Sequence, residues 1–199
     1  MGKCVNSMRL GIFGGTFNPI HVGHLLLAET ARDTLALDRI VFIPTGRPPH
    51  KRAKDLLPGA VRLKLIQWAI RDHPAFAASD IELQRAGTSY SLDTVQILHR
   101  RMPGATLFLL VGQDMLTVPW VGWKELKRLC TVVVAPRPDI RGRPPSSRQR
   151  GLTWLAMPPV AMTSSDIRAR IKAGRSIRYL VPTPVARFIQ RHGLYQEGK

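Results

Sequence analysis

Cysteine is scarce in this sequence, which contains only Cys4 and Cys130 among its 199 residues. Two cysteines so far apart cannot build a disulfide framework, and they lack the close spacing of zinc ligands. Long apolar runs are also missing, because no stretch approaches the roughly 18 to 20 residues of a membrane span. The start of the chain lacks the apolar segment of a secretory signal. We therefore expect reduced thiols, no membrane partner and a cytoplasmic location.

Acidic side chains are few as well: 13 Asp and Glu stand against 30 Lys and Arg, giving a formal net charge of +17. Such an excess suits a nucleic acid, an acidic membrane surface or a small polyanion such as a nucleotide. The basic residues gather in residues 137–150, a stretch rich in Pro and Ser, and in residues 168–191, where no acid occurs. Because no RNA-binding aromatic signature, zinc-finger spacing or basic zipper accompanies them, we interpret residues 137–151 as a solvated loop and do not favour nucleic acid as a partner.

Apolar residues make up 44% of the chain, which is enough for a buried core. The length favours one domain over residues 1–199, with residues 1–7 disordered and residues 160–199 forming a helical end. Apolar, strand-like runs occupy residues 8–13, 39–44, 77–83, 105–111, 131–135 and 152–157. Helical patterns occupy residues 21–37, 59–71, 91–101, 124–130, 164–172 and 182–192. Because the strands are continuously apolar and alternate with helices, we predict a doubly wound, Rossmann-like α/β fold with a parallel sheet covered on both faces.

The first predicted strand is followed by a loop, residues 14–24, that reads GGTFNPIHVGH. Its paired glycines let the backbone approach a phosphate, and the next helix offers that phosphate a partly positive N-terminus. His21 and His24 are three positions apart, so both imidazoles can face one ligand, and Gly23 leaves room for a base or a ribose. Two such donors can stabilise the charge that develops on a phosphate during transfer. A helix cap and a metal site are the alternatives, although no third metal ligand lies nearby in the sequence.

A second phosphate-binding element is predicted near the C-terminus, where residues 163–168 read TSSDIR. Ser164 or Ser165 is expected to cap a helix that runs through residue 172, with Arg168 on its first turn. Hydroxyls, N–H groups and a guanidinium at a helix N-terminus suit the outer phosphates of a triphosphate. An ordinary capped helix uses the same residue types, so this segment alone does not choose between the two interpretations.

Together these two elements resemble the HxGH nucleotidyltransferases, and the chain as a whole resembles one family among them, bacterial nicotinate-nucleotide adenylyltransferase. The resemblance extends from about residue 8 to residue 195. It is carried further by PTGRPPHK at 44–51, TSYSLDT at 88–94, GQD at 112–114 and WVGWKEL at 120–126. Asn18 and Ser91 stand where Asp and Thr are usual in the family, but each keeps a side chain that can hydrogen-bond.

The resemblance implies transfer of the AMP moiety of ATP to nicotinate mononucleotide, with Mg²⁺ arriving on ATP and no metal ligands supplied by the chain. It implies that the groups acting on the phosphates are His21, His24 and Arg168. It implies an ATP site made of Gly14, Gly15, Thr16, Phe17, Gly23, Gly112, Asp114, Ser164, Ser165 and Ile167. It implies a pyridine-nucleotide site made of His50, Lys51, Tyr90, Ser91, Asp93, Thr94, Trp120 and Trp123. We favour Trp120 over Trp123 as the indole that stacks on the pyridine ring.

Other acceptors within the same fold are nicotinamide mononucleotide, pantetheine phosphate and glycerol phosphate. The PPHK loop, the SYSLDT stretch and the tryptophans argue against the last two, whereas the choice between acid and amide stays open. A nucleic-acid-binding module on this fold is an alternative from a different class, and a homo-oligomer is compatible with the sequence. A synthetase fragment is a weaker alternative, because the chain is short and has no Lys-Met-Ser-Lys-Ser-like loop.

Overall fold

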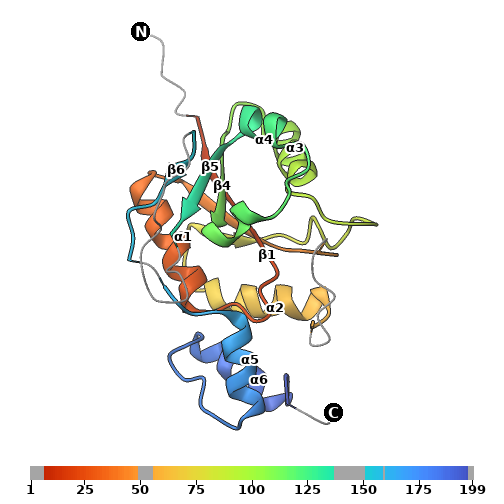
Figure 1. Cartoon of the computed structure of the whole chain (residues 1–199), viewed down its shortest axis with the longest axis vertical. Coiled ribbons are helices and arrows are strands. Elements are labelled where there is room, and N and C mark those ends of the chain that lie inside the picture. The colour runs from red at the N-terminus through yellow and green to blue at the C-terminus, as the bar shows by residue number, and fades with distance from the viewer. Residues whose placement is uncertain (1–6, 49–55, 137–150, 159, 197–199) are drawn as a thin grey trace.

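Six parallel strands form one sheet in the order β3-β2-β1-β4-β5-β6 (Figure 1). In chain order they are β1 (Arg9–Gly15), β2 (Arg39–Pro44), β3 (Phe76–Ala78), β4 (Thr106–Gly112), β5 (Thr131–Ala135) and β6 (Thr153–Trp154). The computed structural model describes residues 7–48, 56–136, 151–158 and 160–196. The strand order reverses beside β1, so the carboxyl ends of β1 and β4 mark the crevice where doubly wound folds bind ligands. The predicted fold class is confirmed.

Helices cover both faces of the sheet. A strand places alternate residues on opposite sides of the sheet, so neighbouring residues of one strand pack against different helices. The helices are α1 (Val22–Thr34), α2 (Gly59–Ile70), α3 (Ser91–Arg101), α4 (Trp123–Leu129), α5 (Ser164–Lys172) and α6 (Thr183–Arg191), and a short 3-10 helix, η1 (Gln113–Thr117), follows β4. Phe42 and Leu110 belong to the buried cluster that includes the apolar residues of α1 and α2. Ile43 and Val111, the next residues along the same strands, belong to the cluster that includes α3 and α4.

The C-terminal helices α5 and α6 lie as a pair beyond α2, on the opposite side from α3 and α4 (Figure 1). Ile167 of α5 and Val185 of α6 are fully buried in the same cluster as α1 and α2. Trp68 of α2 meets Phe188 of α6 edge-on, with 4.6 Å between ring centroids. The C-terminal pair is therefore part of the main core. Among the helices of the described residues, none is long and apolar enough to cross a membrane.

The structure corrects the predicted edges of the sheet. The strand predicted over residues 77–83 ends at Ala78, because the chain then turns and the carbonyl of Asp80 accepts hydrogen bonds from Leu83 N and Gln84 N. The strand predicted over 152–157 contains only Thr153–Trp154, an edge strand paired on one side with β5. The apolar pattern of a segment does not show how many residues of a neighbouring strand it pairs with. Helix η1 was not predicted.

Two further predictions concern the ends of segments. The cap of α5 is Thr163, whose Oγ1 accepts a hydrogen bond from Asp166 N at 3.1 Å, so the expectation of Ser164 or Ser165 was wrong. Asp166 also accepts from the backbone N of Thr163, which completes a capping box. Residues 1–6 and the predicted loop 137–150 lie outside the described residues, whereas the hydroxyl of Ser7 contacts the carbonyl of Gly104.

Candidate active site

The carboxyl end of β1 and the loop that follows it present backbone at the crevice. Gly14 and Gly15, predicted as loop residues, are the last two residues of β1 and pair with Ile43 and Pro44 of β2. A side chain at Gly15 would meet the ring of Phe17 at 3.0 Å, so only glycine fits without displacing that ring. Phe17 itself has a positive φ of 47° and is 2% exposed, which places its ring in the core beneath the loop. Gly14, in contrast, is exposed and has open space where a side chain would lie. The ring of Phe17 thus packs beneath the end of β1, where the backbone of Gly14 is exposed and accessible to a ligand.

The two histidines stack on one another where α1 begins. Their ring centroids are 3.7 Å apart and their planes differ by 29°. His24 Nδ1 accepts a hydrogen bond from the backbone N of His21 at 3.2 Å. A neutral imidazole that accepts at Nδ1 carries its proton on Nε2, so Nε2 is the donor of the His24 ring. The stacking keeps both rings on the same side of the helix start, as the spacing predicted.

The N-terminus of α5 is tied directly to the loop after β1. Ser164 Oγ donates to the carbonyl of Pro19 at 2.8 Å, and Arg168 Nη1 donates to the carbonyl of Asn18 at 2.9 Å. Arg168 Nη2 also donates to Ser165 Oγ at 3.2 Å. These bonds bring the TSSDIR segment beside the residues just ahead of His21. Two segments that are 145 to 150 positions apart are therefore held together where α1 and α5 begin.

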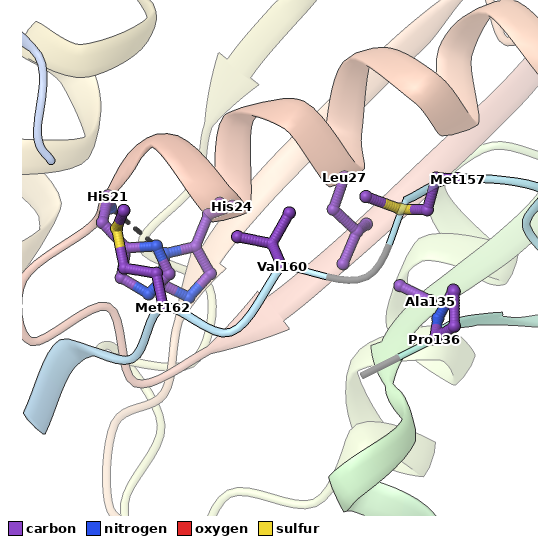
Figure 2. Close-up of a pocket in the computed structure, with 9 residues that line it drawn as sticks. His21, His24, Leu27, Ala135, Pro136, Met157, Val160 and Met162 are labelled. Atoms are coloured by element: carbon purple, nitrogen blue, oxygen red, sulfur yellow. Dashed lines mark hydrogen bonds between the residues drawn. The ribbon is translucent and has the colours of Figure 1, made fainter. Parts of the chain in front are cut away.

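A pocket opens beside the two histidines (Figure 2). Figure 2 shows it between the start of α1, the end of β5 and the side chains of Met157, Val160 and Met162. The residues that line it are His21, Gly23, His24, Leu27, Ala135, Pro136, Met157, Val160 and Met162. A side chain on Gly23 would lie 3.1 Å from the His21 ring and 3.3 Å from Val160, so the glycine keeps this wall open. Apolar walls next to imidazole donors suit a flat ring that is attached to a charged group.

A second group of predicted residues gathers at the start of α3. Ser89 joins it to the loop after β2, because Ser89 Oγ accepts hydrogen bonds from Gly46 N at 3.2 Å and Arg47 N at 3.3 Å. Tyr90, the N-terminal flanking residue of α3, is 36% exposed. Asp93, in the first turn, has its carboxylate 3.8 Å from the guanidinium of Arg85.

The tryptophans Trp120 and Trp123 lie together near this group, with ring centroids 5.2 Å apart. Trp120 Nε1 donates to the carbonyl of Met115 at 2.7 Å, which fixes the orientation of its indole. Gly122 between them has a φ of +66°, and a side chain there would lie 2.3 Å from Leu92 of α3. The close approach of Gly122 to Leu92 is what brings the tryptophan segment against the start of α3.

A buried cation lies beneath both groups of residues. Arg62 is 1% exposed and donates to three carbonyls, those of Thr16 at 2.8 Å, Thr45 at 2.8 Å and Leu57 at 2.9 Å. Burial lowers the pKa of Arg62, and the charge of Glu82 acts in the opposite sense. An arginine remains protonated near neutral pH in spite of such a shift. Its charge therefore adds to a positive potential under the loops that follow β1 and β2.

The comparisons with known proteins identify the family to which the chain belongs. The family model described as "Cytidylyltransferase-like" matches residues 12–170. A Thermomicrobium roseum protein, named as a probable nicotinate-nucleotide adenylyltransferase, is 41% identical over 94% of this chain and 92% of its own. A Thermus thermophilus protein with the same name is also 41% identical, over 95% of this chain and 100% of its own. This chain belongs to the nicotinate-nucleotide adenylyltransferase family.

Solved structures share the fold of this nucleotidyltransferase at lower identity. The Plasmodium falciparum nicotinic acid mononucleotide adenylyltransferase complexed with NaAD has a TM-score of 0.77 and 14% identity, and the match covers 94% of this chain and 97% of that one. A structure from Vibrio parahaemolyticus has a TM-score of 0.69 and 21% identity, covering 96% and 97% of the two chains. At such identities the likeness concerns the path of the backbone.

Several residues assigned from the family resemblance have buried side chains. Ile167 is fully buried in the core and Phe17 is 2% exposed, so either could meet a nucleotide only through its backbone. His21 is also only 2% exposed, but it lines the pocket beside α1. Thr94 is also 2% exposed, and its hydroxyl donates to Glu82. Asp114, in contrast, is exposed on η1 just after β4. His50 and Lys51 lie outside the described residues, so their assignment stays a prediction.

Three residues that shape the site were not predicted from the sequence: Arg62, Glu82 and Tyr195. Tyr195 donates to Asn18 Oδ1 at 2.8 Å, and Leu57 N donates to the same oxygen at 3.2 Å, so the neutral Asn18 serves as an acceptor inside the loop. A signal for Arg62 was present, because it shares the buried stripe of α2 with Leu65 and Ile66. Nothing in the local sequence marks Tyr195, whose partner is distant along the chain.

Proposed function

We propose that this chain transfers the adenylyl group of ATP to nicotinate mononucleotide and releases deamido-NAD and pyrophosphate. The proposal is carried by one observation: Ser164 and Arg168 of α5 hydrogen-bond to the loop that leads into His21 and His24. A triphosphate needs donors on more than one side, and this arrangement supplies them from two segments at the crevice. The names of relatives that are 41% identical over most of the chain favour the same reaction.

The reaction is a direct in-line displacement at the α-phosphorus of ATP. An oxygen of the 5′-phosphate of nicotinate mononucleotide forms the new P–O bond, and the bond from the α-phosphorus to the bridging oxygen breaks. The electron pair of that bond leaves with pyrophosphate, so no covalent enzyme intermediate forms. The attacking phosphate is already ionised near neutral pH and needs no general base. The chain therefore has to position two anions that repel each other and to stabilise the charge on the leaving group.

The groups on the ATP side divide this work by position. His21 and His24 are assigned to the α- and β-phosphates, and Ser164, Ser165 and Arg168 to the β- and γ-phosphates. The exposed backbone at the carboxyl end of β1 provides N–H groups for the same anion. The pocket beside His24, lined by Leu27 and Val160, is assigned to the flat base of the nucleotide. Asp114 is assigned to a ribose hydroxyl, which a carboxylate at a strand end can bind.

The acceptor is assigned to the group at the start of α3. Tyr90, Ser91 and Asp93 lie there beside the tryptophan segment, with Trp120 as the platform for the pyridine ring and Trp123 as the second choice. An indole face suits a flat heteroaromatic ring. Because Asp93 faces Arg85, the cation also offsets a carboxylate that would otherwise repel an anionic acceptor.

Magnesium enters this proposal as part of the substrate, bound to the triphosphate. In the part of the chain that the structure describes, no three His, Cys, Asp or Glu side chains are grouped to hold a metal ion. The side chains that hydrogen-bond to the loop after β1 include hydroxyl and guanidinium groups, those of Ser164 and Arg168 among them, and no carboxylate is among the bonds found there in the described residues. Mg²⁺ prefers oxygen ligands and retains water, so a phosphate-bound ion is chemically consistent with these neighbours. The residues bind and orient the anions while the ion neutralises part of their charge.

The proposal is tested by measuring pyrophosphate release from the purified chain with Mg²⁺, ATP and either nicotinate mononucleotide or nicotinamide mononucleotide. A clear preference for the acid supports the proposed reaction. A preference for the amide would retain the adenylyl transfer but contradict the proposed acceptor. A folded protein that binds ATP and releases no pyrophosphate with either nucleotide would contradict the function.

A further inference from the structure

A buried carboxylate lies behind the acceptor side of the site. Glu82 is 5% exposed, and its Oε1 accepts a hydrogen bond from Thr94 Oγ1 at 2.8 Å. Burial raises the pKa of Glu82, whereas the hydrogen bonds from Thr94 and Ser89 and the charge of Arg85 act in the opposite sense. A buried carboxyl group is costly to keep unless its hydrogen bonds are all satisfied. Glu82 is therefore held in place by its neighbours and constrains them in return.

The proton positions in this network follow from its donors. Ser89 Oγ already accepts from the backbone N–H groups of Gly46 and Arg47, so its own proton is directed toward the carboxylate of Glu82. Thr94 Oγ1 likewise accepts from Arg85 Nη1 at 3.3 Å while it donates to Glu82. Glu82 thus fixes the direction of both hydroxyls. It links the loop after β2 to the first turn of α3.

The loop after β2 is packed tightly against this carboxylate residue. A side chain on Gly46 would lie 2.4 Å from the carbonyl oxygen of Glu82, so the two backbones touch. On the other side of the loop, Arg62 donates to the carbonyl of Thr45 at 2.8 Å. The segment 45–47 is therefore held between a buried cation and a buried carboxyl group, and neither of them is placed against the reacting phosphates.

We propose that Glu82 is a positioning residue for the acceptor nucleotide. It fixes the segments 45–47 and 89–94 relative to each other, so that the groups facing the nucleotide are arranged before it binds. This inference rests on the proposed function, since it concerns the acceptor half of that site. Glu82 acts through Ser89 and Thr94 and does not itself contact substrate.

The substitution Glu82→Gln changes the hydrogen bonds of this side chain without changing its packing volume, because the two side chains have nearly the same size. The amide nitrogen cannot accept from a hydroxyl, so either Ser89 or Thr94 loses its acceptor. The loss of one such bond in a buried network is worth about a tenfold change in an equilibrium. We expect KM for nicotinate mononucleotide to rise about tenfold or more, while KM for ATP changes less than about twofold.

The experiment measures initial rates over both substrates for the wild-type chain, E82Q and the control Asp72→Asn, together with melting temperatures. Asp72 is an exposed carboxylate paired with Arg71, so D72N loses the same charge without touching the network, and its kinetics should match wild type. Ser89→Ala removes the hydroxyl that joins Glu82 to the loop after β2, and it carries the test where E82Q does not fold. In the double variant E82Q/S89A, the increase in KM for nicotinate mononucleotide should be smaller than the two single effects combined.

Equal KM values for the acceptor in E82Q and wild type would overturn the inference, as would parallel rises of both KM values with a lower melting temperature. The second pattern would show a general loosening of the fold. A wild-type chain that turns over nicotinate mononucleotide while E82Q behaves like D72N refutes this inference alone. A wild-type chain that is silent with both pyridine nucleotides refutes the proposed function, and with it the role of Glu82.

Discussion

The hydroxyl of Tyr195 donates a hydrogen bond to Oδ1 of Asn18 at 2.8 Å, across 177 positions of sequence. Tyr195 is 8% exposed, and burial raises its pKa, so the phenol stays protonated and remains a donor at neutral pH. Asn18 also accepts from Arg168 through its carbonyl. The end of the chain and α5 therefore hold the same residue of the loop after β1 from two directions.

Tyr195→Phe should weaken the ATP side of the site while leaving the fold intact. It removes one hydrogen bond to a buried acceptor that keeps Leu57 N as a second donor, so the free energy of unfolding should fall by about 1 kcal/mol. KM for ATP should rise several-fold and KM for the acceptor should change less. Tyr179→Phe, at a site that is 80% exposed, is the matched control. Unchanged KM for ATP in Y195F would contradict this coupling.

His24→Ala should lower turnover by about a hundredfold or more, because it removes a donor that stabilises charge on the phosphates. Circular dichroism and the melting temperature should show a folded protein. His99→Ala, on the exposed last turn of α3, should keep wild-type turnover. A folded H24A protein with near-normal turnover would remove His24 from the proposed phosphate contacts.

Arg62→Met should be strongly destabilising, since it leaves the carbonyls of Thr16, Thr45 and Leu57 buried without their donor. We expect the free energy of unfolding to fall by about 3 kcal/mol or more, measured by urea denaturation. Arg62→Lys should recover only part of this loss, because an ammonium cannot reproduce the planar fork of a guanidinium. Arg71→Met, on the surface, should cost less than about 0.5 kcal/mol, and an equal loss in both variants would refute the argument.

Cys130 should be chemically inert in the folded chain. It is 8% exposed, and burial raises the pKa of its thiol to about 12, so almost no thiolate exists at neutral pH. In a Cys4→Ser variant, which reports on Cys130 alone, modification by a thiol reagent should be roughly a hundredfold slower in the native than in the urea-unfolded protein. Similar rates in the two states would show that the thiol is accessible.

Glu29 should make stability depend weakly on pH at the acid end. Its hydrogen bond and ion pair with Arg32, at 2.7 Å, and its pairing with His73, at 2.9 Å, lower the pKa of Glu29. A carboxyl whose pKa is lower in the folded state stabilises the fold above its unfolded pKa, and this contribution disappears as the pH falls through the folded pKa.

Glu29→Gln should therefore be less stable than wild type by less than about 1 kcal/mol at neutral pH, because the pairs are partly exposed. The difference should shrink as the pH falls below the ordinary pKa of a glutamic acid, and it should disappear once Glu29 is protonated in both the folded and the unfolded state. Glu125→Gln, an exposed carboxylate hydrogen-bonded by Gln96, provides the comparison for charge loss alone. A difference that persists unchanged into acid would contradict the assigned cause.

The sequence predicted helices and strands best where the residues that bound an element are as clear as its apolar pattern. The strand 39–44, the helix 91–101 and the strand 131–135 were predicted with the bounds that β2, α3 and β5 have. It failed at β3 and β6, whose lengths depend on how far a single neighbouring strand extends. Pairing is a property of two segments, so a local pattern cannot give its extent.

The site divides in the same way. The motifs predicted which segments carry donors, because glycine pairs, closely spaced histidines and a hydroxyl-rich helix start have local chemical uses. They did not reveal Arg62, Glu82 or Tyr195, which act on carbonyls and hydroxyls of other segments. Glu82 looks like any acid between two apolar residues until its burial beside Thr94 is known.

The sequence by itself determined the alternation of strands and helices, the family and the segments that bear the phosphate donors, because each of these is encoded in local spacing and residue type. The tertiary structure decided how the segments meet: α5 against the loop after β1 through Arg168, and the loop after β2 against α3 through Ser89 and Glu82. Those contacts join residues that are distant along the chain, and their geometry is set only when the sheet and its two cores are packed.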